Sequence, residues 1–143
     1  MPAPQLIQAS AVAIDGRALL IEGEPGSGKS SLALALIDRG AQLIGDDGVT
    51  LRLEGSQVRA CPPPNIAGLL EIRNVGLVEV ETAPPTPLAL ILSLHENAER
   101  LPESPTQRNV LGLAIPQLAF TPGSIAPAQR TEWALRQHGL TFD

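Results

Sequence analysis

The sequence is poor in cysteine, in aromatic residues and in positive charge. Its one cysteine, Cys61, has no partner for an internal disulfide, which is typical of a reducing cytoplasm, and its neighbours "ACPPP" offer neither a base nor metal-ligand spacing. Two phenylalanines, one tryptophan and no tyrosine leave little for nucleobases to stack on. A net charge of −5 lacks the clustered cations that a nucleic-acid backbone requires. We therefore expect a cytoplasmic protein that does not bind nucleic acid.

Long apolar runs are missing as well, although 43% of the residues are hydrophobic. No segment is apolar over enough residues to span a bilayer, and "MPAPQLIQAS" at the start has no basic cluster ahead of an apolar stretch. We therefore expect no membrane partner and no secretory signal. The 143 residues show no repeat and no convincing boundary, which predicts one domain over residues 1–143 with a proper core.

Lysine occurs only once, as Lys29, and every other cation is an arginine. That lysine stands in "GEPGSGKSS" (23–31), which fits the phosphate-binding pattern G-x-x-x-x-G-K-[ST]. In this interpretation Lys29 reaches the β- and γ-phosphates of a nucleotide, and the Ser30 hydroxyl binds Mg²⁺. The residues predicted to hold the nucleotide are Gly23, Glu24, Pro25, Gly26, Ser27, Gly28, Lys29 and Ser30.

The segments on either side of this loop distinguish a phosphate cradle from an ordinary glycine-rich turn. "LIQASAVAI" (6–14), a turn at "DG" and "ALLI" (18–21) predict a β-hairpin whose second strand leads directly into the loop. "KSSLALALIDR" (29–39) predicts a helix, and Gly40 follows at a position typical of a helix C-terminus. A strand before and a helix after place the N–H groups of the helix start at the phosphates. The context therefore favours phosphate binding.

Further strands are predicted after this helix. "AQLIG" (41–45) predicts a short buried strand that ends at Asp46 and Asp47. "VTLRLEG" (49–55) alternates apolar and polar residues, as an edge strand does, and "LALILSL" (88–94) has the composition of a central strand.

The remaining segments are richer in glycine and proline. "CPPPNIAG" (61–68) predicts a rigid connection, and the apolar, β-branched stretch 69–81 contains a glycine. The segment 101–127 is expected to be irregular apart from a strand at "NVLGLAI" (109–115), and a terminal helix is predicted at 128–139.

Asp46 and Asp47 form a candidate acidic pair. On its own, "DDG" is more typical of a solvated hairpin turn. Its position changes this, because a strand end one helix after the phosphate loop lies in the crevice where open α/β sheets hold their ligands. Carboxylates at that place can hold Mg²⁺ and accept a hydroxyl proton, as phosphoryl transfer to an alcohol requires.

Other polar residues give weaker indications. Glu71 and Arg73 alternate with apolar residues in "LLEIRNVG", which fits the exposed face of a strand as well as it fits a carboxylate for the metal and a guanidinium for phosphate. Both interpretations stay open. Arg100, in "ENAERLPE", has by itself the features of a surface residue, and His95 and His138 have no partner at catalytic or metal-binding spacing.

"GEPGSGKSSLALALIDRGAQLIGDD" followed by "LLEIRNVGLVEV" resembles the catalytic domain of the bacterial HPr kinase/phosphorylase family, from about residue 6 to about residue 103. Many nucleotide-binding proteins share the loop alone, whereas its combination with "DRG", "DD" and "EIR-x-x-G" is specific. The resemblance implies an α/β fold, a P-loop-containing mixed sheet with flanking helices similar to phosphoenolpyruvate carboxykinase. The chain looks like the short form, which lacks the N-terminal domain of longer members.

The function that this resemblance implies is the ATP- and Mg²⁺-dependent phosphorylation of a serine on HPr, the phosphocarrier of the sugar phosphotransferase system. By motif position Lys29 is the P-loop lysine, while Ser30 and Glu71 hold Mg²⁺. Asp46 supports the metal, and Asp47 takes the seryl proton. The longer members assemble as hexamers, so a homo-oligomer is among the expected partners, without a fixed oligomeric state.

Arg100 matches a family arginine just before a leucine and is carried over as a catalytic residue. The chain also departs from the family. Gln8 stands where a catalytic histidine is usual, Ser31 where an acidic residue is usual and Asn74 where a glycine is usual. Glutamine cannot exchange a proton at neutral pH. The basic loop tied to dephosphorylation appears as "IPQLAFTPG", without its arginines. The resemblance therefore favours kinase activity over phosphorylase activity.

Two alternatives from other classes stay open. A nucleotide-binding regulator that has lost catalysis is supported by Gln8 and Ser31. The retention of all four of Lys29, Ser30, Asp47 and Glu71 opposes it. A P-loop kinase of a small alcohol would need a substrate pocket or lid, for which the segment 101–127 offers no clear candidate.

Overall fold

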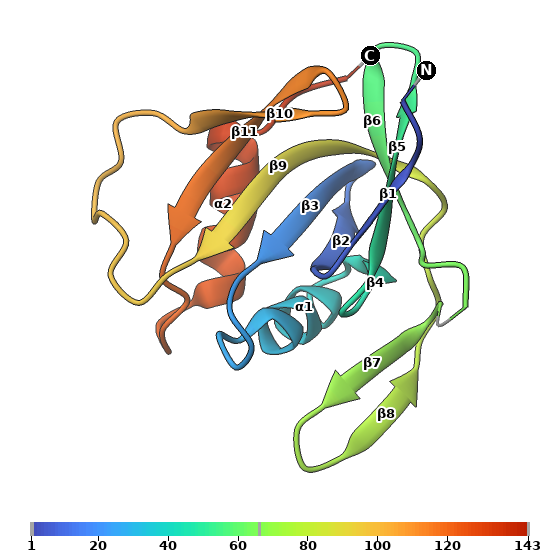
Figure 1. Cartoon of the computed structure of the whole chain (residues 1–143). Helices are drawn as coiled ribbons and strands as arrows, with labels where there is room; N and C mark the ends of the chain where they lie inside the picture. Colours follow the sequence, from blue (N-terminus) through green and yellow to red (C-terminus); the bar gives the residue numbers. More distant parts are fainter. Residues whose placement is uncertain (1, 66, 143) are drawn as a thin grey trace.

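A computed structural model describes residues 2–65 and 67–142 as a curled β-sheet with two helices packed against it (Figure 1). The helices are α1 (Lys29–Ile37) and α2 (Pro127–His138). The strands are β1 (Gln5–Ile7), β2 (Ser10–Ile14), β3 (Arg17–Glu22), β4 (Gln42–Gly45), β5 (Val49–Glu54), β6 (Gln57–Cys61), β7 (Leu69–Ile72), β8 (Gly76–Glu79), β9 (Thr86–Leu94), β10 (Thr106–Val110) and β11 (Leu113–Phe120). Over these described ranges, no helix combines the length and the hydropathy needed to cross a membrane.

Strand β9 lies at the centre of the sheet, as predicted for 88–94. It runs parallel to β3 on one side and to β11 on the other, and its first residues pair antiparallel with β6. The sheet continues from β3 through β2 to β4, and from β6 through β5 to β1. Because β3, β9 and β11 are parallel, their carboxyl ends meet at one edge, the usual place for ligands in such sheets. The predicted mixed sheet with flanking helices is confirmed.

Apolar side chains cover both faces of the central strands. Leu19 and Ile21 of β3 pack in one buried cluster with Leu36 of α1. Leu20, which points to the opposite face, packs in a second cluster with Ile91 of β9. All five side chains are fully buried, as is typical of a parallel strand with layers on both sides. The tightly packed strand β3 therefore holds the start of the segment 23–28 in a fixed place.

Two strand predictions need correction, and a third segment adopts a form that was not predicted. The run 6–14 is two strands, because β1 pairs with β5 whereas β2 pairs with β3 and β4. Strand β5 is not at the edge, since β1 and β6 flank it. The stretch 69–81 folds back at Asn74 (φ 67), a residue type that tolerates this left-handed conformation, to form the hairpin β7–β8. The predicted connection 61–68 contains residue 66, which lies outside the described residues.

The segment 101–127 was expected to be irregular, and this is wrong. It contains the hairpin β10–β11, and the predicted strand 109–115 spans the turn of that hairpin. Leu111 (φ 52) and Gly112 (φ 95) have the two positive φ angles that a tight hairpin turn requires. Pro116 is tolerated in β11 because the pairing with β9 begins only at Gln117.

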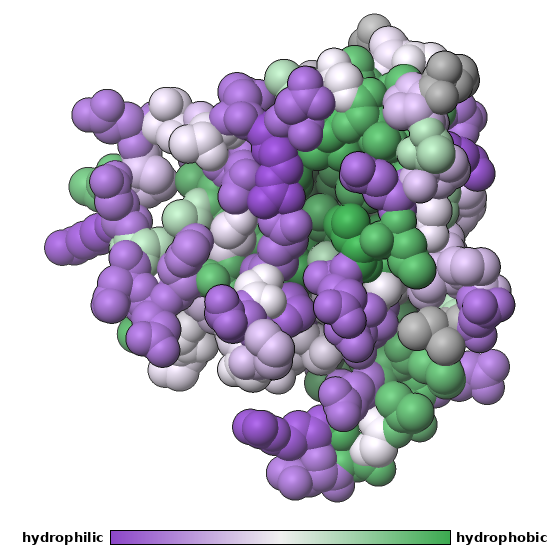
Figure 2. Space-filling view, in the orientation of Figure 1, coloured by the Kyte–Doolittle hydropathy of each residue, from purple (hydrophilic) through white to green (hydrophobic). Residues whose placement is uncertain are grey.

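The hairpin β7–β8 forms a separate two-stranded sheet that projects from the body of the molecule (Figure 1). Its strand β7 packs against α1. Val75 and Leu77 near its turn are exposed, and apolar surface lies beside hydrophilic side chains at this lower end of the molecule in Figure 2.

Candidate functional site

The loop 23–28 connects β3 to α1. Gly26 (φ 81) and Gly28 (φ 103) have the positive φ angles that favour glycine, and a Cβ atom at Gly23 would collide with the hydroxyl of Ser27. Helix α1 has no side-chain cap at Gly28 and no acidic residue in its first turn. The N–H groups at the start of α1 therefore have no side-chain partner in the described part of the chain. Together with the helix dipole they form a site for an anion.

Two side chains, one in this loop and one at the start of α1, also suit a phosphate. The Lys29 ammonium donates to the carbonyl oxygens of Gly23 (2.8 Å) and Glu24 (3.1 Å), so the cation stays at the loop. The Ser27 hydroxyl is buried and has no hydrogen-bond partner among the described residues. A buried hydroxyl without a partner is costly, and an incoming phosphate oxygen would satisfy it.

Asp46 connects three elements, β2, α1 and β7, at the start of α1. Its side chain is buried, and its Oδ1 accepts hydrogen bonds from the hydroxyls of Ser10 in β2 (2.9 Å) and Ser30 in α1 (2.7 Å). Its Oδ2 accepts the backbone N–H of Glu71 in β7 (3.0 Å). The structure thus brings the predicted residues Ser30, Asp46 and Glu71 together beside the phosphate loop.

Asp47 has a different environment from its neighbour. It is exposed, it adopts a left-handed conformation (φ 59), and its carboxylate accepts no hydrogen bond from the residues that the structure describes. The turn 45–48 that contains Asp47 requires a glycine at position 45, because a Cβ atom at Gly45 would collide with the carbonyl oxygen of Gly48. The predicted acidic pair therefore divides into one fixed, buried carboxylate and one free carboxylate at the surface. Arg73 is exposed beyond the end of β7.

The donors around Asp46 fit a magnesium ion that arrives with a nucleotide. The Asp46 carboxylate and the Ser30 hydroxyl offer oxygens, which Mg²⁺ prefers, and this ion is usually held by one or two carboxylates together with substrate phosphates. Within the described residues, no three His, Cys, Asp or Glu side chains gather closely enough to hold a metal ion on their own. The carboxylate of Asp46 and the hydroxyl of Ser30 therefore suit a nucleotide-bound ion better than a resident one, and Glu71 reaches this place through its backbone N–H.

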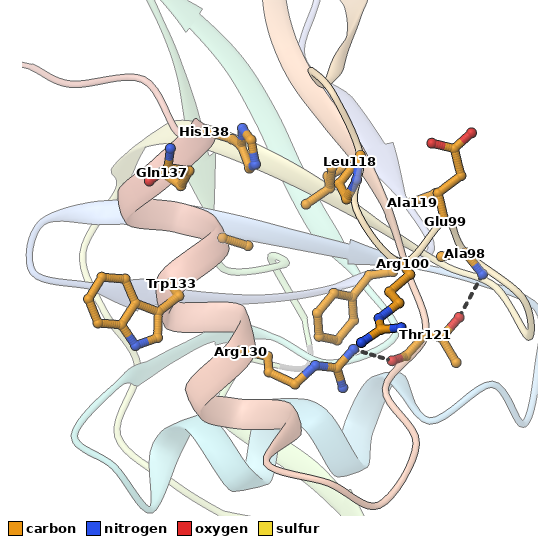
Figure 3. Close-up of a pocket in the computed structure, with 13 residues that line it drawn as sticks. Ala98, Glu99, Arg100, Leu118, Ala119, Thr121, Arg130, Trp133, Gln137 and His138 are labelled. Carbon is orange, nitrogen blue, oxygen red and sulfur yellow. Dashed lines mark hydrogen bonds between the residues drawn. The ribbon is translucent and has the colours of Figure 1, made fainter.

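Arg100 lies apart from this group. It lines a hollow of about 490 Å³ between the loop after β9 and helix α2, with Trp133 and His138 on the helix side (Figure 3). The described lining of this hollow includes no residue of the loop 23–28, and it includes neither Asp46 nor Glu71. In the same hollow Arg130 donates to the carbonyl oxygen of Thr121 (2.8 Å), which fixes the segment after β11. A catalytic role for Arg100 stays a prediction.

Sequence reasoning missed a polar chain at the carboxyl ends of the strands. Glu22, the last residue of β3, receives two hydrogen bonds from the guanidinium of Arg108 in β10, and this carboxylate raises the pKa of Arg108. Arg108 also donates to Gln117 (3.0 Å), whose amide donates to Ser93 (2.8 Å). The chain ties the β10–β11 hairpin to the residue directly before the phosphate loop. No sequence motif marks the pair Glu22–Arg108, because its members are far apart in the chain.

Ser10 was also missed, since a serine in an apolar strand has no distinguishing spacing. Gln8, at the position where the resemblance expects a histidine, is exposed at the bend between β1 and β2. Cys61 is buried, and burial raises the pKa of its thiol, which keeps the less reactive protonated form and agrees with a structural role.

Comparison with known proteins gives consistent matches. Residues 3–123 match the family model described as the HPr Serine kinase C-terminal domain. The chain is 35% identical over 114 residues to an HPr kinase/phosphorylase of Variovorax paradoxus (strain S110), a match that covers 70% of this chain and 36% of the relative. A relative of the same name from Alkaliphilus metalliredigens (strain QYMF) is 32% identical over 142 residues, covering 87% and 45%. The chain thus spans less than half the length of these relatives.

A solved structure agrees over nearly the whole chain. The Hpr(Ser) kinase/phosphatase from Coxiella burnetii superposes with a TM-score of 0.79 at 31% sequence identity, covering 93% of this chain and 95% of that chain. The predicted fold class, a P-loop kinase fold similar to phosphoenolpyruvate carboxykinase, is thereby confirmed.

Proposed function

The chain belongs to the family of HPr serine kinase C-terminal domains, and on that premise we propose that it phosphorylates a serine of the phosphocarrier protein HPr with ATP and Mg²⁺. The observation that carries the proposal is the 2.7 Å contact between Ser30 and Asp46. It places a buried carboxylate next to the uncapped start of α1, where the terminal phosphates of a nucleotide bind. The names of the relatives, HPr kinase/phosphorylase, support the same activity.

The loop and the helix start hold the triphosphate. The N–H groups of α1 and the Lys29 ammonium bind its β- and γ-phosphate oxygens, and the Ser27 hydroxyl gains a partner. Ser30, Asp46 and Glu71 would hold Mg²⁺, which when bound would neutralise negative charge on the phosphates. Asp46 can orient these groups because three hydrogen bonds fix its own carboxylate.

Asp47 is the proposed proton acceptor. The seryl oxygen attacks the γ-phosphorus in line, the bond from the γ-phosphorus to the bridging oxygen breaks with its electron pair leaving on ADP, and the seryl proton passes to the Asp47 carboxylate. An exposed base suits a protein substrate, because the serine of a second protein can reach it without entering a closed pocket. This function implies a cytoplasmic location and HPr as the partner.

Incubation of the protein with γ-labelled ATP, Mg²⁺ and purified HPr tests the proposal. We expect phosphoserine on HPr, its loss when EDTA removes the metal, and its loss in Lys29→Ala together with weaker ATP binding. Nucleotide binding without transfer would contradict the proposal and indicate a regulator. Label on a small alcohol instead of HPr would indicate a metabolite kinase. We expect the reverse reaction, the dephosphorylation of phospho-HPr, to be weaker than the phosphorylation of HPr, because Gln8 cannot exchange a proton.

A further inference from the structure

We propose that the groove on the β9 and β11 side of the phosphate loop binds the nucleoside part of ATP, an inference that rests on the proposed kinase function. The groove has a volume of about 970 Å³. One wall is the loop itself, from Glu24 to Ser27, and the other walls are the segment 94–99 after β9 and the segment 121–123 after β11. Its size lies within the range of small-molecule sites.

The order of the strands decides which way the nucleotide lies. Ser30 and Asp46 belong to the side of β3 on which β2 and β4 follow, whereas β9 and β11 lie on the other side. The γ-phosphate must lie beside the carboxylates for transfer to an acceptor. A phosphate chain that crosses the loop from that end therefore delivers its α-phosphate and nucleoside to the β9 side, where the groove begins at Ser27.

The side chains of the groove suit a nucleoside better than a phosphate. Carboxylates of Glu96 and Glu99 line it together with the amide of Asn97, and no lysine or arginine occurs among the described lining residues. Carboxylates only accept hydrogen bonds, so they repel phosphates but pair with ribose hydroxyls and base amino groups. The described lining also contains no Phe, Tyr or Trp, so that His95 is its one aromatic ring, and discrimination between bases would rest on hydrogen bonds.

The walls of the groove are tied to each other before any ligand binds. The backbone N–H of His95 donates to the carbonyl oxygen of Phe120 (2.9 Å), and that of Ala98 donates to the Thr121 hydroxyl (2.8 Å, Figure 3). Because both bonds join the segment after β9 to the segment after β11, the groove is preformed, as ligand sites usually are.

A pocket-filling variant tests the inference with two ligands that share their phosphates. Ala119 is exposed on β11 and lines the groove, so Ala119→Phe should fill it. We expect the Kd for Mg-ATP to rise about tenfold or more, a loss of about 1.4 kcal/mol. The Kd for inorganic tripolyphosphate with Mg²⁺ should change less than about twofold, because the phosphate loop is intact. Ala114→Phe is the matched control, since Ala114 is also exposed on β11 but lies outside the groove lining.

The other outcomes distinguish failure of the groove assignment from failure of the kinase proposal. Unchanged ATP binding in Ala119→Phe would show that the nucleoside lies elsewhere, and equal losses for both ligands would show damage to the phosphate loop. If Ala119→Phe does not fold, Asn97→Trp repeats the test from an exposed residue of the opposite wall. A wild-type protein that binds neither ligand would refute the kinase proposal itself. If the wild-type protein binds both ATP and tripolyphosphate but transfers no phosphate to HPr, the kinase proposal fails while the groove assignment is kept.

Discussion

At the scale of single residues, the neighbouring aspartates can be separated by one conservative change each. Asp47→Asn keeps the shape of the side chain and removes the proton acceptor. Because Asp47 is exposed and its carboxylate has no hydrogen bond in the described part of the structure, folding should be unaffected. We expect the rate of transfer to HPr to fall about 10²-fold or more while the Kd for ATP changes only a few-fold. Single-turnover kinetics and calorimetric titration measure the two quantities.

Asp46→Asn is the contrasting variant, because Asp46 accepts hydrogen bonds from Ser10, Ser30 and the N–H of Glu71. In this variant an NH₂ group replaces one carboxylate oxygen, and it cannot accept the hydrogen bond that was donated to that oxygen. Both protein stability and Mg-ATP affinity should therefore fall. The roles are reversed if Asp47→Asn keeps full activity while Asp46→Asn loses transfer with its Mg-ATP affinity intact.

The sequence motifs predicted that Ser30, Asp46 and Glu71 lie close together, but not how Asp46 and Asp47 differ. The spacing after the phosphate loop brought Asp46 to the start of α1, because strand, loop and helix are local features. That Asp46 is buried and Asp47 exposed depends on a turn conformation and on β7 packing from a distant segment, which residue spacing does not encode. The roles of both, like that of Arg100, stay predictions.

At the scale of elements, Gly40 ends α1 in the way that its position predicts. It has a φ of 105°, its N–H donates to Ile37, and the N–H of Ala41 donates to Leu36, which together form a Schellman motif. Gly40→Ala forces a Cβ atom into this conformation and should lower the free energy of unfolding by about 1–2 kcal/mol. Urea denaturation measures the change. Asp38→Ala, an exposed neighbour with ordinary φ, is the control, and an equal loss in both would refute the role of Gly40.

The elements that local patterns specify were the ones that could be predicted. The β2–β3 hairpin, α1 and the central β9 have turn, helix and apolar signatures of their own. The β10–β11 hairpin has none, because Leu111 is not a typical turn residue and prolines at 105, 116 and 122 suggest an irregular segment. Its pairing with β9 is a tertiary contact, and such contacts override local propensity.

At the scale of the whole molecule, the pair Glu22–Arg108 holds the β10–β11 hairpin against the strand that carries the phosphate loop. Glu22 is the residue immediately before the loop, and the hairpin completes the sheet beside the proposed nucleoside groove. Loss of this pair should therefore lower both the stability of the fold and the affinity for ATP, although neither residue is part of the phosphate-binding motif.

A double-mutant cycle with Glu22→Gln and Arg108→Gln measures the coupling. The side chains are only 25% and 36% exposed, so water screens the pair incompletely, and we expect a coupling free energy of about 1 kcal/mol in urea denaturation. Molar salt should reduce the coupling. The pair Arg52–Glu54 is the control, because its side chains are 46% and 52% exposed and its coupling should be smaller. If the two couplings are equal and both Glu22→Gln and Arg108→Gln bind ATP as the wild type does, the pair neither secures the hairpin nor positions the loop.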